Sequence, residues 1–182
     1  MRRIFLWAAR NRWLKDHLPR MRFMRRAVRR FMPGETLGDA LGAAAPLQAV
    51  GIKTMYTRLG ENLTDLAEAD EVAAHYVDVV DQIVANGIDG EISVKPTQLG
   101  LDLDEAACRR SLDRLVDASA AQGRLLWIDM ESAVYVDRTL QLFRAVRART
   151  PYIGLALQAY LYRTERDVED LAPLGAALRL VK

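Results

Sequence analysis

The sequence predicts an α/β fold of parallel strands that belongs to the (β/α)₈ barrel class. Short hydrophobic segments alternate with longer helical patterns, and polar residues follow the ends of successive strands. No glycine-rich phosphate-binding loop follows a strand, which disfavours the doubly wound open sheet. Because a complete barrel needs about 250 residues and eight strands, we expect these 182 residues to form a barrel truncated after about five strands, with N-terminal helices before it.

Charge divides the chain into two segments. Residues 1–32 contain eleven Lys or Arg and one Asp, whereas residues 33–182 contain fifteen Lys or Arg and twenty-three Asp or Glu. Between Leu14 and Phe31 apolar residues recur every three, four or seven positions, which predicts a basic amphipathic helix or helix pair. We therefore divide the chain into a basic arm, residues 1–32, and a barrel segment, residues 33–182.

Two interpretations of the basic arm remain open. The arm either contacts an anionic membrane surface, or it packs its apolar side on the barrel segment while its arginines face water. Nucleic-acid binding is not expected, because no base-reading motif accompanies the positive charge.

Composition also limits the compartment and the cofactor class. Cys108 is the only cysteine, which excludes an internal disulfide and favours a reducing compartment. Arg10 and Arg12 interrupt the first apolar run, and no stretch approaches the roughly twenty apolar residues of a membrane span. We expect a cytoplasmic protein, peripheral at the inner face of the membrane if the basic arm binds lipid. No cluster of His, Cys and Asp has metal-ligand spacing, so no metal is expected.

The barrel segment begins with a helix, a strand and a second, longer helix. The first helix starts at Thr36, and the first strand is IKTMYT, which follows Gly51. Apolar residues at helical spacing predict a helix from Asp65 to Asn86, which Gly87 ends.

The same alternation then repeats to the last residue. The strand EISVK precedes a helix from about Asp104 to Ala121, LLWID one from about Val134 to Ala148, and IGLALQ one from about Arg163 to Leu174. LRLVK is the fifth strand. These strands are short and hydrophobic, as expected where helices cover a parallel sheet.

Polar side chains stand where the later strands end. They are Lys95 in EISVKPTQLGL, Asp129 and Glu131 after LLWI, Gln158 in IGLALQ, and Arg179 and Lys182 in LRLVK. The carboxyl ends of barrel strands are where this class of fold carries its chemistry, so these residues are candidates for a site. Ser93 and Cys108 have no base partner in the sequence and are interpreted as ordinary strand and helix residues.

Several motifs occur together in an order that resembles one known family. ISVKPTQLGL, IDMES with the helix VDRTLQLFR, GLALQAYLYRTERDV and LRLVK resemble the barrel of the FAD-dependent proline dehydrogenases in order and spacing. MPGETLGDAL with TRLGENL resembles the entry to that barrel. The resemblance runs from about Arg30 to Lys182 and implies a TIM barrel of the proline dehydrogenase type, in a monofunctional enzyme.

The resemblance implies a reaction and a set of site residues. Hydride would pass from L-proline to the flavin N5, giving 1-pyrroline-5-carboxylate, and the electrons would pass to a quinone. Lys95 falls on the family's lysine for the substrate carboxylate, Asp129 on its active-site aspartate, and Arg179 on the arginine near the reactive edge of the flavin. The family's FAD-binding positions fall on Met130, Gln158, Arg179, Val181 and Lys182.

The family carries further substrate residues on late strands that this sequence does not contain, which implies that residues 1–182 alone are inactive. Two other functions remain open. One is a non-catalytic, membrane-associated module that acts through residues 1–32. The other is a flavin-binding barrel enzyme for a different small imino or amino acid.

Overall fold

The computed structural model describes residues 34, 36–60 and 63–182, in two compact units, Met1–Pro46 and Leu47–Lys182. The helix α4 (Leu37–Ala49), which crosses the boundary between the units at Pro46, starts where the sequence predicts a helix, because Thr36 and Asp39 cap it. The hydroxyl of Thr36 accepts the amide of Asp39 at 3.1 Å, and the carboxylate of Asp39 accepts the amide of Thr36 at 3.2 Å. The basic arm, residues 1–32, lies outside the described residues, so its helix and the proposed division stay predictions.

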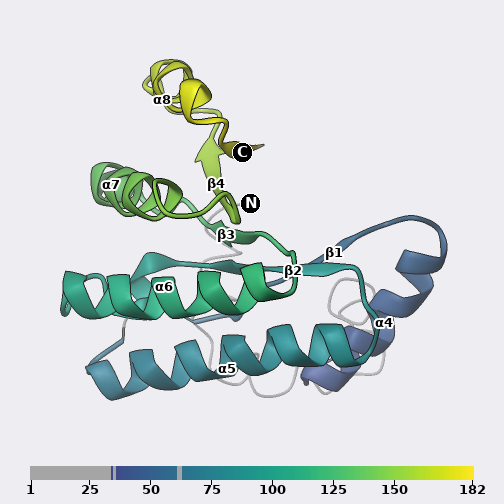
Figure 1. Cartoon of the computed structure of the whole chain (residues 1–182). Helices are drawn as coiled ribbons and strands as arrows, with labels where there is room; N and C mark the ends of the chain where they lie inside the picture. The colour runs from purple at the N-terminus through teal and green to yellow at the C-terminus, as the bar shows by residue number, and fades with distance from the viewer. Residues whose placement is uncertain (1–33, 35, 61–62) are drawn as a thin grey trace, which may run out of the picture. The chain divides into compact units, whose positions relative to one another are not determined.

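The second unit contains one sheet of five parallel strands in the order β1-β2-β3-β4-β5 (Figure 1). The strands are β1 (Thr54–Tyr56), β2 (Gly90–Val94), β3 (Leu126–Ile128), β4 (Ile153–Gln158) and β5 (Ala177–Val181). Each strand pairs with the next one in the sequence, so the sheet lacks the reversal of strand order that marks a doubly wound fold. The prediction of a barrel-type parallel sheet with five strands is confirmed.

The helices between the strands are α5 (Leu66–Ala85), α6 (Glu105–Ala121), α7 (Val136–Arg147) and α8 (Thr164–Leu171), with short 3₁₀ turns η2 (Pro96–Leu99), η3 (Ala133–Tyr135) and η4 (Ala172–Leu174). Local signals set the ends of the two longest. The carboxylates of Asp65 and Asp104 accept backbone amides of the first turns of α5 and α6. Gly87 and Gly123, with φ of 62° and 65°, follow their last turns in the left-handed conformation.

The hydrophobic core lies between the helices and one face of the sheet. The strand side chains on this face are almost fully buried; they are Ile92, Val94, Leu126, Ile128, Ile153, Leu155 and Leu157. In Figure 1, α5, α6, α7 and α8 follow one another along the same side of the strands. One outer layer of helices therefore covers the sheet, as in a barrel wall.

The other face of the sheet is concave. Alternate residues along each strand point to opposite faces, so the neighbours of the core residues, such as Ser93, Trp127 and Ala156, stand on this inner face. The guanidinium of Arg179 on β5 contacts the sulfur of Met55 on β1. The fifth strand therefore faces the first across the inner side, and the sheet is curled into part of a barrel.

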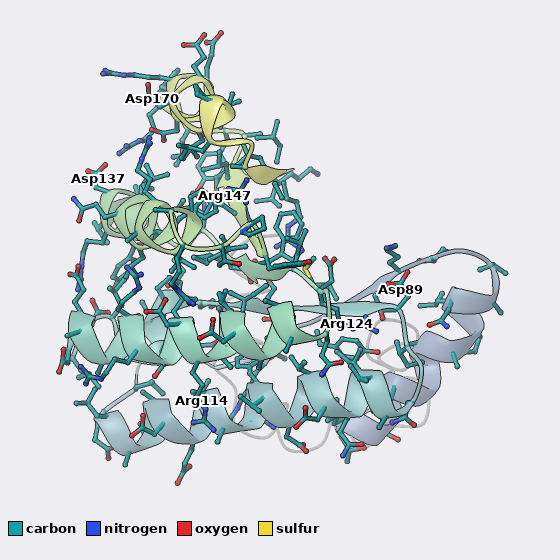
Figure 2. The ribbon with its side chains drawn as sticks, viewed as in Figure 1. Asp89, Arg114, Arg124, Asp137, Arg147 and Asp170 are labelled. Carbon is teal, nitrogen blue, oxygen red and sulfur yellow. The ribbon has the colours of Figure 1, made fainter. Side chains whose placement is uncertain are left out.

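Arginines tie the ends of the helices to the strands (Figure 2). Arg147, in the last turn of α7, donates to the carbonyls of Leu174 and Gly175 at 2.9 and 2.8 Å and so holds the chain where it enters β5. Arg124, just before β3, donates to the carbonyl of Gly90 at 2.7 Å. These contacts cross between neighbouring repeats and fix the strands relative to one another.

Candidate active site

Four residues share one level of the inner face. The register is set by three strand pairs: Val94 with Ile128, Ile128 with Leu155, and Ala156 with Arg179. One position further along, Lys95, Asp129 and Ala156 come level with Arg179, and period-two alternation turns all of them to the inner face. Three candidates predicted from separate motifs are thus brought to the same row.

Asp129 and Arg179 form the central contact of this row. A guanidinium nitrogen of Arg179 donates to the Asp129 carboxylate at 2.7 Å and to the hydroxyl of Ser93 at 3.3 Å. Ser93 in turn donates to the same carboxylate oxygen at 2.6 Å. Both charged side chains are partly buried: that of Arg179 is 30% exposed and that of Asp129 is 23% exposed. The hydrogen bond between them is therefore charge-assisted and only partly screened by water.

Lys95 lies immediately after β2, where the sequence predicts the strand to end. Its backbone is extended, with φ −96° and ψ 131°, and Pro96 then begins the 3₁₀ turn η2. Proline fixes this change of direction because its ring restricts φ and it has no amide hydrogen for the sheet. The lysine side chain is therefore delivered at the carboxyl end of the strand, and it is half-buried.

Gln158 ends β4 and joins it to the loop after β3. Its amide nitrogen donates to the carbonyl of Glu131 at 2.8 Å, and a longer contact of 3.4 Å reaches the carbonyl of Met130. Its Oε1 is buried and accepts no hydrogen bond from the described residues. The Met130 side chain is 8% exposed. Gln158 thus has one oxygen available to a donor on a ligand.

Val181 and Lys182 stand at the end of β5. The Val181 carbonyl accepts the amide of Ala159 at 2.7 Å, which ties β5 to the loop after β4. Lys182 is exposed. No described contact joins these two residues to the Asp129 and Arg179 pair, and their predicted contact with a cofactor stays a prediction.

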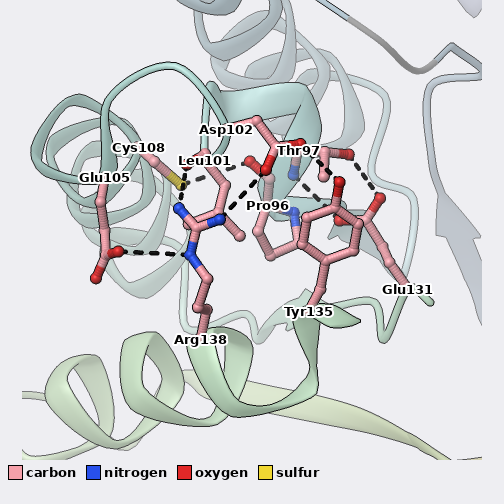
Figure 3. Close-up of polar contacts among 9 residues, drawn as sticks. All are labelled: Pro96, Thr97, Leu101, Asp102, Glu105, Cys108, Glu131, Tyr135 and Arg138. Atoms are coloured by element: carbon pink, nitrogen blue, oxygen red, sulfur yellow. Dashed lines mark hydrogen bonds and ion pairs between the residues drawn. The ribbon is translucent and has the colours of Figure 1, made fainter. Parts of the chain in front are cut away.

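A polar cluster stabilises the loops beside the row (Figure 3). Arg138 on α7 donates to Asp102 at 3.2 Å and also to the carbonyl of Leu101, and the hydroxyl of Tyr135 donates to Asp102 at 2.7 Å. The hydrogen bond to Asp102 raises the pKa of Tyr135 above its usual value. These contacts join the loop after β2 to the start of α7.

Three polar contacts of the site are not predicted from the sequence. Ser93 is a strand residue, as expected, and it also donates to Asp129; Thr97 donates to Glu131 across two loops. The third is the contact of the Trp127 ring with the guanidinium of Arg179. Alternation of Glu91, Ser93 and Lys95 along one strand is the signal that could have revealed a polar inner face.

The described residues contain no group of three or more His, Cys, Asp or Glu arranged to hold a metal ion. The row offers two cations, Lys95 and Arg179, the Asp129 carboxylate and, beside it, the amide of Gln158. This set suits an anionic or zwitterionic ligand, because Lys95 and Arg179 supply the positive charge.

Comparison with known proteins identifies the family. The sequence model of proline dehydrogenase matches residues 40–179. The chain belongs to the proline dehydrogenase family. Proline dehydrogenase 1 of Bacillus subtilis subsp. natto is 30% identical over 182 residues, which are 100% of this chain and 60% of the relative. Proline dehydrogenase of Deinococcus radiodurans is 30% identical over 158 residues, 84% of this chain and 51% of the relative. The chain thus spans little more than half the length of these proline dehydrogenases.

Solved structures agree on the fold. Proline utilization A from Bdellovibrio bacteriovorus, inactivated by N-propargylglycine, superposes with a TM-score of 0.71 at 20% identity over 82% of this chain and 19% of that one. A point mutant of proline utilization A from Bradyrhizobium japonicum gives 0.69 at 23% identity over 87% of this chain and 19% of that one. The curled five-stranded sheet is therefore part of the barrel fold of proline dehydrogenase domains.

Proposed function

We propose that the protein oxidises L-proline to 1-pyrroline-5-carboxylate with bound FAD and passes the electrons to a quinone. One observation carries this proposal: in a chain of the proline dehydrogenase family, Lys95 stands level with the Asp129 and Arg179 ion pair. Proline is a zwitterion, and its oxidation needs a cation for the carboxylate and a second positive charge near the electron acceptor.

Lys95 is assigned to the substrate carboxylate. A lysine ammonium offers three donors on a flexible stem and suits a small carboxylate that must enter and leave. Asp129 does not contact the substrate in this assignment; it holds Arg179 in place through the 2.7 Å contact. Ser93 supports the same carboxylate from β2.

The inner face fits a planar flavin. FAD would supply the acceptor for a hydride. Gln158 has a buried Oε1 and Arg179 a buried Nε that have no partner among the described residues, so an acceptor and a donor are available. Ala156 on the intervening strand has a small side chain, which lets a flat ligand approach the sheet there. Met130, Val181 and Lys182 are assigned to the cofactor with Gln158 and Arg179.

A reconstitution experiment tests this function. The full-length protein, loaded with FAD, is expected to reduce dichlorophenolindophenol when proline is added. Lys95→Met should raise KM for proline at least about tenfold, because that is the effect expected from the loss of one charge-assisted hydrogen bond. The affinity for FAD should change less. Failure to bind FAD, or faster turnover of another imino or amino acid than of proline, would contradict the assignment.

We also propose that residues 1–182 alone do not turn over proline. Among the described residues five strands form part of a barrel wall. The inner face is therefore open to water between the two edge strands, β1 and β5. Water weakens the charge interactions on which the reaction depends. Proline-dependent dye reduction by purified 1–182 at the rate of a complete relative would contradict this.

We propose peripheral membrane contact through the basic arm. No helix in the described ranges is long and apolar enough to cross a membrane, whereas residues 1–32 carry a net charge of +10. Anionic lipid attracts such a segment by about 1 kcal/mol for each nearby Lys or Arg, and a quinone acceptor is lipid-soluble. Co-sedimentation with phosphatidylglycerol vesicles should be lost when residues 1–32 are removed; retention would assign any binding to the barrel segment.

A further inference from the structure

Trp127 occupies an unusual place on the inner face. It lies on β3 between Ser93 of β2 and Gly154 of β4 in the register. Its indole N–H donates to the carboxylate of Glu91 at 2.6 Å. A Cβ added at Gly154 would lie 2.6 Å from two atoms of the ring, so the ring lies directly over the glycine backbone. A hydrogen bond to Glu91 thus fixes the indole N–H, and the face of the ring packs on the backbone of Gly154.

The ring supports Arg179. The guanidinium carbon lies 5.2 Å from the centroid of the Trp127 ring, within the range of a cation–π contact. The same guanidinium donates to Asp129 and Ser93. Arg179 therefore has one nitrogen bound by a carboxylate and one face placed over an aromatic ring, while its Nε has no partner among the described residues.

We propose that Trp127, oriented by Glu91, is a positioning residue that fixes the guanidinium of Arg179 for the bound flavin. This inference rests on the proposed function. Arginine has a long side chain with considerable rotamer freedom, and Arg179 must reach across from β5 to groups on β2 and β3. Asp129 and Ser93 hold one nitrogen and the sulfur of Met55 contacts another, while the ring supports the guanidinium plane from one face. The ring face fixes that plane and leaves the opposite face and Nε to the ligand.

The surroundings of Trp127 favour this role over packing. Its neighbours in the chain, Leu126 and Ile128, are fully buried in the core beneath the helices. Trp127 points the other way and is only half-buried, among Glu91, Ser93 and Arg179. Apart from the backbone of Gly154, the contacts described here are polar or cationic, so its replacement removes support from Arg179.

The test is a double-mutant cycle on the FAD dissociation constant of the full-length protein, measured by flavin fluorescence. Trp127→Leu should weaken FAD binding about fivefold to twentyfold, the range of a partly desolvated cation–π contact. Trp127→Phe keeps an aromatic face and should stay within about threefold. In an Arg179→Met background, Trp127→Leu should change the constant less than about twofold.

Phe143→Leu is the matched control, because Phe143 lies on α7 and is fully buried in the core on the other face of the sheet. It should lower the thermal midpoint without a change in FAD affinity. Equal losses from Trp127→Leu in both backgrounds, or a loss with Trp127→Phe as large as with Trp127→Leu, would overturn the proposal.

A second measurement separates this proposal from the proposed function. If the protein binds no FAD, the proposed function fails, and the same cycle is then measured on urea unfolding without ligand. Coupling of more than about twofold in the unfolding constant between Trp127 and Arg179 would support the positioning contact. Additive effects in that cycle would overturn it.

Discussion

Glu131 holds Thr97 by both carboxylate oxygens. Oε1 accepts the Thr97 hydroxyl at 2.6 Å, and Oε2 accepts its backbone amide at 3.1 Å (Figure 3). Thr97 lies two residues after Lys95, and Glu131 two residues after Asp129. The contact therefore fixes the loop that carries the lysine against the loop that carries the aspartate, at the point where both strands end.

Replacing Glu131 by Gln should lower the free energy of unfolding by about 1–2 kcal/mol, because one of the two hydrogen bonds is lost and the remaining one no longer has a charged acceptor. Urea unfolding at neutral pH measures the change. Glu105→Gln is the matched control: Glu105 lies 3.5 Å from Arg138 with a 53% exposed side chain, so its loss should cost less than about 0.5 kcal/mol. Equal losses would show that the Thr97 contact contributes nothing specific.

Gly154→Ala tests how closely the Trp127 ring approaches β4. The added Cβ would lie 2.6 Å from ring carbons, so the ring must move, and we expect a loss of about 1–3 kcal/mol in the free energy of unfolding. Gly42→Ala in α4 meets nothing within 4 Å and should stabilise the protein by about 0.5–1 kcal/mol through helix propensity. A neutral Gly154→Ala would mean that the ring does not rest on the strand.

Local sequence signals predicted the elements of the barrel segment well. The caps at Asp65 and Asp104 and the glycines at 87 and 123 each act within a few residues, so they can be identified without knowledge of the rest of the fold. Lys95, Asp129 and Gln158 lie at or just after the ends of their strands, as the alternation predicts, whereas Arg179 lies in the middle of β5. Their roles were implied by the resemblance, and the geometry brings two of them, Asp129 and Arg179, into direct contact.

Contacts between distant strands could not be predicted in this way. Glu131 reaches Thr97 across 34 residues, and Arg179 reaches Ser93 across 86. Such pairs depend on the strand register and on the curl of the sheet. A register shift of one residue would turn every side chain of a strand to the opposite face and remove these contacts. The contacts of Trp127 are of the same kind, since its partners Glu91 and Arg179 lie on two other strands.

Arg163 anchors the loop after β4. It binds Asp167 with two nitrogens, at 2.7 and 3.1 Å, and Asp137 of α7 at 2.8 Å. These hydrogen bonds, to Asp167 first and Asp137 second, raise the pKa of Arg163 above its usual value. The arginine side chain is 40% exposed and that of Asp167 is 9% exposed, so the aspartate depends on this partner more than the arginine does.

Arg163→Met should therefore lower the free energy of unfolding by about 1–2 kcal/mol. The loss is limited because water partly screens the charge of this arginine. Arg166→Met is a control on the same helix: Arg166 lies 4.0 Å from Asp170 and is 85% exposed, so no measurable change is expected. Thermal unfolding of both variants distinguishes them. A loss in Arg166→Met as large as in Arg163→Met would assign the effect to general charge, not to the loop anchor.

Cys108 gives the chain a predicted dependence on alkaline pH. The thiol is fully buried beneath the Pro96 carbonyl, 3.5 Å from Sγ, and burial raises its pKa to about 12. In the unfolded chain the pKa is about 8.5. The unfolded state therefore loses this proton first as pH rises, so the stabilisation is complete below about pH 8.5 and is lost as pH approaches the folded value.

Between pH 8.5 and 10 the free energy of unfolding should fall with a slope that approaches about 1.4 kcal/mol per pH unit from this group. Burial also raises the pKa of Tyr76 above 10.0, so its contribution begins only at higher pH. Urea unfolding of Cys108→Ala across the same window should give a flatter profile, while other titrating groups contribute equally to both proteins. Parallel profiles, or rapid reaction of the native thiol with Ellman's reagent at pH 8, would show that the sulfur is not held in its buried, protonated state.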